Sequence, residues 1–173
     1  MSSISFVKAS ITDLDCDAIV NAANDRLMYG GGVCGCIFRA AGVEKLKKEL
    51  EGICFCPTGG AVITAGCDLK ARYIIHAVGP IYQDGLHDEA RLLSSAYKSS
   101  LELATEHRLG SIAFSLISSG IYRYPKREAF IIALKSCAEF INERKDYEID
   151  IIFALIDESL LELGKSLLKE LNI

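Results

Sequence analysis

The chain has 173 residues, half of them apolar, and a formal net charge of −4 at pH 7. This length fits one domain, residues 1–173, with a continuous hydrophobic core. The acidic balance argues against broad binding to a nucleic-acid backbone, and the apolar runs are too short to cross a bilayer, so we expect neither nucleic acid nor membrane as a partner.

Strand-like and helix-like patterns alternate along the whole chain. In chain order they predict an edge strand over 4–8, a buried strand over 17–21, a helix over 33–51, strands over 59–64 and 72–78, a helix over 88–107, a strand over 111–117, a helix over 125–144, a strand over 149–155 and a helix over 157–171. Apolar strands that alternate with helices predict a sheet covered on both faces. This is an α/β fold of three α/β/α layers.

The most informative stretch is the first strand-to-helix connection, AIVNAANDRLMYGGGVCGCIFRAAG at residues 18–42. Three consecutive glycines, Gly30 to Gly32, open the helix, and Gly31 lies at their centre. Glycines let the backbone approach a ligand closely, and a helix start offers free N–H groups to an anion. Asn21 and Asn24 add uncharged donors and acceptors that suit ribose hydroxyls. The stretch predicts a cradle for a phosphorylated nucleotide or sugar.

Two other glycine motifs fit this loop less well. Gly30, Gly32 and Gly35 match G-x-G-x-x-G, but nine residues separate Asn21 from Gly31, whereas a dinucleotide fold places its glycines directly after the strand. A Walker-type phosphate loop would need a Gly-Lys-Ser/Thr sequence, which does not follow. A plain tight turn would need a single glycine, so three glycines beside two asparagines favour binding.

A second turn has the same character. Ser118, Ser119, Gly120, Ile121 and Tyr122 follow the strand over 111–117, just before the proline that opens the next helix. Small residues and a glycine at the end of a strand form an anion nest, and ligands of open α/β sheets bind beyond the carboxyl ends of the strands. We therefore expect the two turns to face each other and to clamp a diphosphate. Tyr122 either packs on a sugar or closes the core.

Together these motifs resemble the macrodomain family of ADP-ribose-binding modules. The matching segments are DAIVNAAN at 17–24, GGGV at 30–33, RAAG at 39–42, PTGGAVITAG at 57–66, YIIHAVGP at 73–80 and SSGIY at 118–122. They occur in the family's order and cover most of the chain. The resemblance implies a three-layer α/β/α sandwich around a mixed central sheet, with a cleft for ADP-ribose.

The resemblance also implies roles for individual residues. Asn24 would bond the distal ribose, and Gly31, Gly32 and Val33 would wrap that ribose and the diphosphate. The backbone N–H groups of residues 118–122 would hold the diphosphate. Asn21 would brace the glycine loop from behind.

The chain departs from the family pattern at several places, among them Cys36, Phe38 and Arg123, and three departures bear directly on the ligand. Cys34 stands where hydrolytic members usually carry an aspartate. Ser10, followed by Ile11, replaces the aspartate that reads the adenine amino group, and Ile156 stands where several members place an aromatic side chain on adenine. The phosphate and distal-ribose cradle thus matches the family, whereas the adenine end and the candidate base differ.

The function that the resemblance implies is binding of ADP-ribose and hydrolysis of its conjugates, from modified acidic side chains of proteins or from O-acetyl-ADP-ribose. Asn24 and Cys34 are the candidate catalytic residues. A thiol is a poor base unless it is ionised, but some members act without the aspartate, by letting a substrate phosphate oxygen activate the water. Two alternatives stay open: a reader of ADP-ribose without catalysis, and a binder of a related nucleotide-sugar diphosphate.

The remaining cysteines and histidines predict no further site. Seven cysteines form no Cys-x-x-Cys pair, and Cys54-x-Cys56 has no third ligand, so we expect free thiols in a cytoplasmic protein without a metal or cofactor. The N-terminal residues lack the pattern of a secretion signal. His76 lies inside a predicted buried strand, where we expect it to be a hydrogen-bonded core residue.

Overall fold

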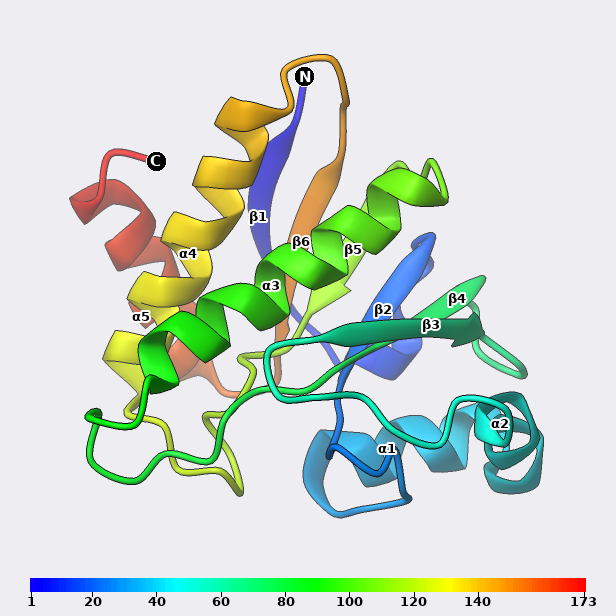
Figure 1. Ribbon diagram of the computed structural model, residues 1–173. Helices are drawn as coiled ribbons and strands as arrows, with labels where there is room; N and C mark the ends of the chain where they lie inside the picture. The colour runs from blue at the N-terminus through cyan, green and yellow to red at the C-terminus, as the bar shows by residue number, and fades with distance from the viewer.

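A six-stranded mixed sheet forms the centre of the computed structural model, which describes residues 1–173 (Figure 1). Its strands are β1 (Ser3–Lys8), β2 (Ala18–Ala22), β3 (Ala61–Ala65), β4 (Tyr73–Ala77), β5 (Ser111–Phe114) and β6 (Asp150–Leu155), in the spatial order β1-β6-β5-β2-β4-β3. All neighbouring pairs are parallel except β3 and β4, which are antiparallel. The mixed sheet and the edge position of β1 are as predicted.

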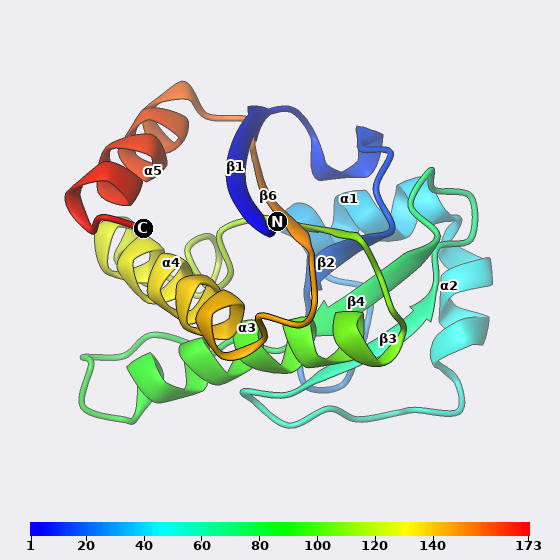
Figure 2. The same ribbon diagram turned by 90° about the horizontal axis from the view of Figure 1, so that it is seen from above.

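Five helices cover the two faces of this sheet. They are α1 (Gly32–Ala41), α2 (Val43–Leu50), α3 (Glu89–Glu106), α4 (Lys126–Glu143) and α5 (Glu158–Glu170), and a short 3₁₀ turn, η1, spans Ile11–Asp13. Seen from above, α1 and α2 lie on one side of the sheet, and α3, α4 and α5 lie on the other (Figure 2). The predicted three-layer arrangement is confirmed. None of these helices combines the length and the apolar character needed to span a membrane.

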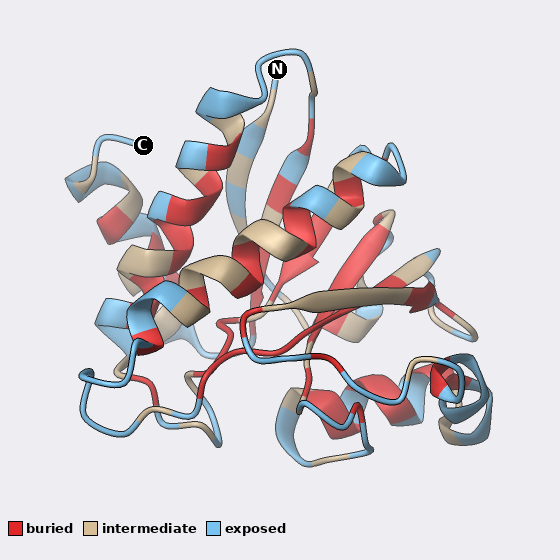
Figure 3. Ribbon diagram, in the orientation of Figure 1, coloured by how far each residue is buried: buried red, intermediate tan, exposed pale blue.

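The strands supply side chains to two separate cores, because successive residues of a strand point to opposite faces. On β2, Ala18 and Val20 pack toward the layer of α3, α4 and α5, whereas Ile19 packs toward α1 and α2. Phe114 and Phe153 stack at the centre of the first core, with 5.9 Å between their ring centroids. Each such side chain stabilises the fold by about 1.5–3 kcal/mol when fully buried. Figure 3 shows this burial along the strands and the inner faces of the helices.

Most predicted elements agree with the observed ones to within two residues at each end, and two differ by more. The helix predicted over 33–51 is two helices, because Gly42 between them has a φ of +90°. Apolar residues continue at a helical period on both sides of this glycine, so the sequence pattern hides the break. The strand predicted over 111–117 ends at Phe114, because the Ile117 N–H donates to the hydroxyl of Tyr97, at 3.1 Å, instead of to a neighbouring strand.

The connections after β2 and β5 leave the sheet in opposite directions. The chain passes from β2 to α1 on one face and from β5 to α4 on the other, although the two strands are parallel neighbours. Both connecting turns lie at the lower end of the sheet in Figure 1. Such a switch point opens a crevice beyond the carboxyl ends of the strands, where ligands of α/β proteins bind.

Candidate functional site

A cleft of about 870 Å³ occupies this crevice. Its volume lies within the range of small-molecule sites in proteins. It is lined by residues that follow four parallel strands: Ser10 and Ile11 after β1, Ile156 and Asp157 after β6, residues 115–122 after β5, and Asn24 with residues 30–34 after β2. The cleft therefore runs across the ends of four of the six strands, from the edge strand β1 to the central strand β2.

The turn after β2 is closed by the side chain of Asn24. Its Nδ2 donates to the carbonyl oxygen of Met28, at 2.8 Å, and its Oδ1 accepts the Met28 N–H, at 3.0 Å. An amide side chain has two N–H donors and two acceptor lone pairs. One donor and one lone pair of Asn24 therefore remain for a ligand in the cleft, which Asn24 lines.

The glycine run forms the start of α1. The N–H groups of Gly32, Val33 and Cys34 belong to the first helical turn and bond to no backbone acceptor. Gly32 has a φ of +58°, a conformation that side chains disfavour. A Cβ at Gly35 would lie 2.6 Å from the carbonyl oxygen of Gly30, so this glycine lets the loop pack directly on its own helix.

The turn after β5 presents a second set of free donors. The N–H groups of Gly120, Ile121 and Tyr122 have no backbone partner, while the Tyr124 N–H donates to the carbonyl of Ser118, at 2.9 Å, and closes the turn. Ser118 has a φ of +65°, and its buried hydroxyl bonds to no other group. Such successive N–H groups form a nest for an anion.

The two turns approach each other across the cleft. A Cβ built on Gly31 would lie 3.1 Å from Cδ1 of Ile121, and one on Gly32 would lie 3.6 Å from the same atom. The structure thus brings the two predicted turns together. The charged side chains that line the cleft are few, Arg39 and Asp157. An anion between the turns would therefore meet backbone dipoles rather than side-chain charges.

Cys34 is a buried thiol on the floor of the cleft, with 5% of its surface exposed. Burial raises its pKa, and hydrogen bonds to Asn21 and Gly30 oppose this effect only in part. Its Sγ lies 3.7 Å from Nδ2 of Asn21 and 3.8 Å from the carbonyl oxygen of Met28. At neutral pH the side chain is a protonated thiol that accepts from Asn21 and donates to Met28.

The residues after β1 and β6 form the other end of the cleft. Ser10 directs its Oγ toward Oγ1 of Thr12, at 2.8 Å, within its own turn. Ile11 is buried, whereas Ile156 is 78% exposed at the rim. This end offers apolar surface and few polar groups.

The predicted ligand-binding residues all line the cleft except Asn21, which lies buried beneath it. Sequence reasoning did not single out Arg39, Gly79 or Asp157, which also line it. Gly79 precedes the proline of the YIIHAVGP segment, and its missing side chain makes room for Ser118. Gly79 could therefore have been identified from the sequence as a site of close packing. For Arg39 and Asp157 the sequence offers only their positions after the glycine run and after β6.

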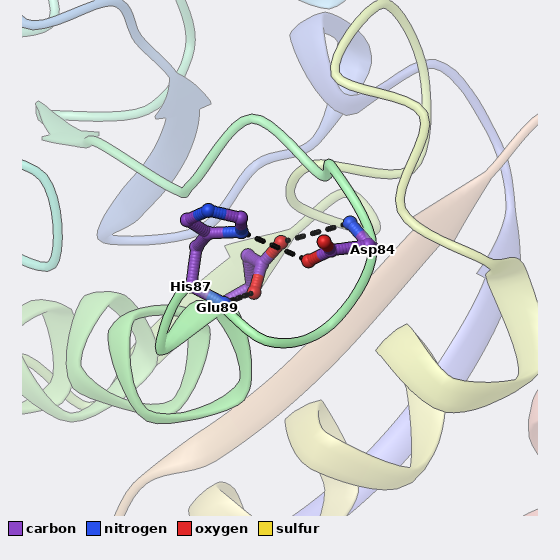
Figure 4. Close-up of side chains that lie close together, drawn as sticks. All are labelled: Asp84, His87 and Glu89. Carbon is purple, nitrogen blue, oxygen red and sulfur yellow. Dashed lines mark hydrogen bonds and ion pairs between the residues drawn. The ribbon is translucent and has the colours of Figure 1, made fainter.

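Outside the cleft, Asp84, His87 and Glu89 bring their side chains together at the start of α3 (Figure 4). Burial alone would raise the pKa of Glu89, but backbone N–H donors, among them those of Gln83, His87 and Gly85, outweigh it and lower the pKa to about 2. Their distances to the carboxylate range from 2.6 to 3.2 Å. These donors occupy the acceptor positions of the Glu89 carboxylate oxygens. The side chain of Glu89 therefore fixes the loop that precedes α3.

Comparison with known proteins adds to this geometry. A family model, the Macro domain, matches residues 20–133. The ADP-ribose glycohydrolase MACROD2 of Xenopus laevis is 45% identical over 170 residues, which are 96% of this chain and 40% of that protein. The Oceanobacillus iheyensis macrodomain with ADP has a TM-score of 0.90 at 38% identity, covering 96% of this chain and 90% of that one. The Trypanosoma brucei macrodomain in complex with ADP-ribose has a TM-score of 0.88 at 36% identity, covering 95% and 68%.

Proposed function

We propose that this chain, which belongs to the macrodomain family, binds ADP-ribose in the cleft and releases it from ADP-ribosylated acidic side chains. The observation that carries the proposal is the pair of opposed turns after β2 and β5, whose free N–H groups face one crevice. Two similar solved macrodomains are described with ADP and with ADP-ribose. Both ligands contain the diphosphate that such a pair of turns fits.

The cleft suggests one orientation for the ligand. The diphosphate lies between the start of α1 and the turn after β5, where donors converge on negative charge. The distal ribose then reaches the free donor and acceptor of Asn24, and Tyr122 packs beside it. The adenosine extends toward Ser10, Ile11 and Ile156 after β1 and β6.

Hydrolysis in this cleft would depend on positioning. Asp157 is the only carboxylate that lines the cleft, and it follows β6, which β5 separates from β2 and Asn24. We therefore assign the base to a phosphate oxygen of the ligand, which takes a proton as water attacks, while the modified carboxylate leaves. Asn24 and the glycine turn hold the water and the ribose, and such positioning supplies up to about 7–11 kcal/mol of a barrier. The relative named a glycohydrolase supports this activity.

Cys34 favours a second candidate function, a reader of ADP-ribose without turnover. The thiol is buried, its pKa is raised, and both of its neighbours are already hydrogen-bonded to it. It therefore offers no base at neutral pH. In this case the same cleft binds the ligand but leaves the ester bond intact.

A paired assay distinguishes these functions. Calorimetry should give a dissociation constant for ADP-ribose in the micromolar range, about −8 kcal/mol, and ADP-ribose should be released from a protein modified on glutamate and from O-acetyl-ADP-ribose. Binding without release at high protein concentration identifies a reader. No heat with ADP-ribose removes both functions, and heat with another nucleotide-sugar diphosphate instead identifies the ligand as a related compound.

Cys34→Asp sharpens the assay. Position 34 is the third residue of α1, where a carboxylate is favoured by the helix dipole and lies beside the Asn21 donor. If the wild type is silent, release by this variant shows that only the base is missing. If the wild type is active, comparable release by both proteins supports the ligand phosphate as base.

A further inference from the structure

Beneath the cleft, three buried polar side chains form a continuous hydrogen-bonded row across the sheet. Asn21 of β2 and His76 of β4 are register partners, and Nδ2 of Asn21 lies 3.1 Å from Nδ1 of His76. On the other side of the ring, Nε2 of His76 lies 3.0 Å from Oγ1 of Thr64 on β3. None of the three lines the cleft, and at most 6% of each is exposed.

The donors in this row point in one direction. The Thr64 hydroxyl donates to the carbonyl of Ala65, at 3.1 Å, so its oxygen accepts from Nε2–H of His76. Burial lowers the pKa of His76 to about 4, and a neutral ring protonated at Nε2 has a bare Nδ1 that accepts from Asn21. The second N–H of Asn21 faces Sγ of Cys34, whose S–H faces the carbonyl of Met28.

The row ends on the group that orients Asn24. The carbonyl oxygen of Met28 accepts both from Cys34 and from Nδ2 of Asn24. Oδ1 of Asn21 is buried without a partner. Turning this amide over would place that oxygen against the bare Nδ1 of His76, where two acceptors would meet. The ring therefore fixes the amide, although an unpaired buried oxygen destabilises the fold.

We propose that His76 is a positioning residue, which acts through Asn21 and Cys34 on the Met28 carbonyl and so orients the amide of Asn24 for the distal ribose. The inference rests on the proposed binding of ADP-ribose, because it assigns a role in that binding to a side chain that does not touch the ligand. The row thereby couples the antiparallel edge of the sheet to the ligand-binding turn.

The first test needs no ligand. Long-range proton–nitrogen NMR spectra of protein with labelled histidine should show His76 with a protonated Nε2 and a bare Nδ1. A protonated Nδ1 in the wild type would overturn the proposal, since the Asn21 amide would then lack its acceptor. In His76→Leu, the side-chain amide signals of Asn24 should shift, and unchanged signals would also overturn it. These readouts remain valid if ADP-ribose does not bind, so they separate this inference from the proposed function.

The second test measures affinity for ADP-ribose by calorimetry. His76→Leu removes the acceptor and should weaken binding about tenfold, whereas His76→Asn places an oxygen near the position of Nδ1 and should keep affinity within about threefold. Ile75→Val is the matched control, because Ile75 is buried on the same strand but faces the other core. It should lower stability without changing affinity. Equal affinity of the folded leucine and asparagine variants contradicts the proposal.

Thr64→Val keeps the proposal testable if His76→Leu does not fold. The valine has nearly the same shape but leaves Nε2–H of His76 without an acceptor, so the ring should shift toward the Nδ1–H form and binding should weaken about threefold. An unchanged ring and unchanged affinity would show that the row has no positioning role.

Discussion

The two ends of the cleft are built from different parts of the chain. Where β2 and β5 end, the groups that face the cleft are backbone N–H groups and the amide of Asn24, which is fixed to Met28. Where β1 and β6 end, they are the side chains of Ser10, Ile11, Ile156 and Asp157, of which only Ser10 and Asp157 offer polar atoms. Recognition at the first end depends on conformation, whereas recognition at the second depends on residue type.

The largest effect is expected from a negative charge placed among the free N–H groups of the turns after β2 and β5. Gly32→Glu forces a side chain into a backbone conformation with φ of +58° and places a carboxylate beside the diphosphate. Strain of about 1–2 kcal/mol and charge repulsion should together weaken ADP-ribose binding about a thousandfold in calorimetry. Gly52→Glu is the matched control, because it adds the same charge at an exposed glycine with open space around it. Equal affinities of the two variants would contradict the claim that ligand binding depends on the backbone conformation where β2 and β5 end.

The buried histidine of the row beneath the cleft, His76, should make the stability of the fold depend on pH. His76 titrates near pH 4 when folded and near 6.5 when unfolded, because burial lowers its pKa. Between these values the unfolded chain binds a proton that the folded chain does not, so stability is complete above pH 6.5 and falls as the pH drops toward 4, by about 3 kcal/mol. Denaturant unfolding at several pH values should show this slope in the wild type and not in His76→Asn. Identical slopes would place the titration elsewhere.

Asn24→Ala removes both the contact to the ribose and the two hydrogen bonds that close the turn after β2. We expect affinity for ADP-ribose to fall by about 2 kcal/mol, or about thirtyfold. Asn172→Ala, near the C-terminus and outside the cleft, should bind as the wild type does. An Asn24→Ala variant with wild-type affinity would show that the glycine turn holds its shape and its ligand without this side chain.

The smallest effect is expected at the side-chain end. The hydroxyl of Ser10 already pairs with Thr12, so Ser10→Ala should change affinity for ADP-ribose by no more than about threefold. Calorimetry against Asn24→Ala provides the comparison. If Ser10→Ala lowers the affinity for ADP-ribose as much as Asn24→Ala does, the two ends of the cleft contribute equally to binding. That result would contradict the proposed difference between them.

The residues of the two turns after β2 and β5 could be predicted from the sequence because each turn is one continuous segment. Glycine runs, asparagines and small residues beside strand ends have local conformational consequences, and β2 and β5 each carry their turn directly after them. The layers followed from the alternation of strands and helices. The break at Gly42 did not, because the apolar period continues through it, and the end of β5 depends on a hydroxyl from α3, that of Tyr97.

The hydrogen-bonded row beneath the cleft could not be predicted in the same way. Thr64, His76 and Asn21 are far apart in the chain and meet only through the order of β3, β4 and β2 in the sheet. The sequence indicates a hydrogen-bonded core histidine and a bracing asparagine, but not that they bond to each other. The direction of the row depends on one further contact, from Thr64 to the backbone of its own strand.

The binding of one ligand by both turns can be measured directly in an amide NMR titration of the labelled protein with ADP-ribose. The N–H groups of Gly32, Val33 and Cys34, and those of Gly120, Ile121 and Tyr122, should shift most and together, because both turns bind one diphosphate. Shifts confined to one turn, or largest at residues outside the cleft, would contradict the claim that opposed backbone donors hold the ligand.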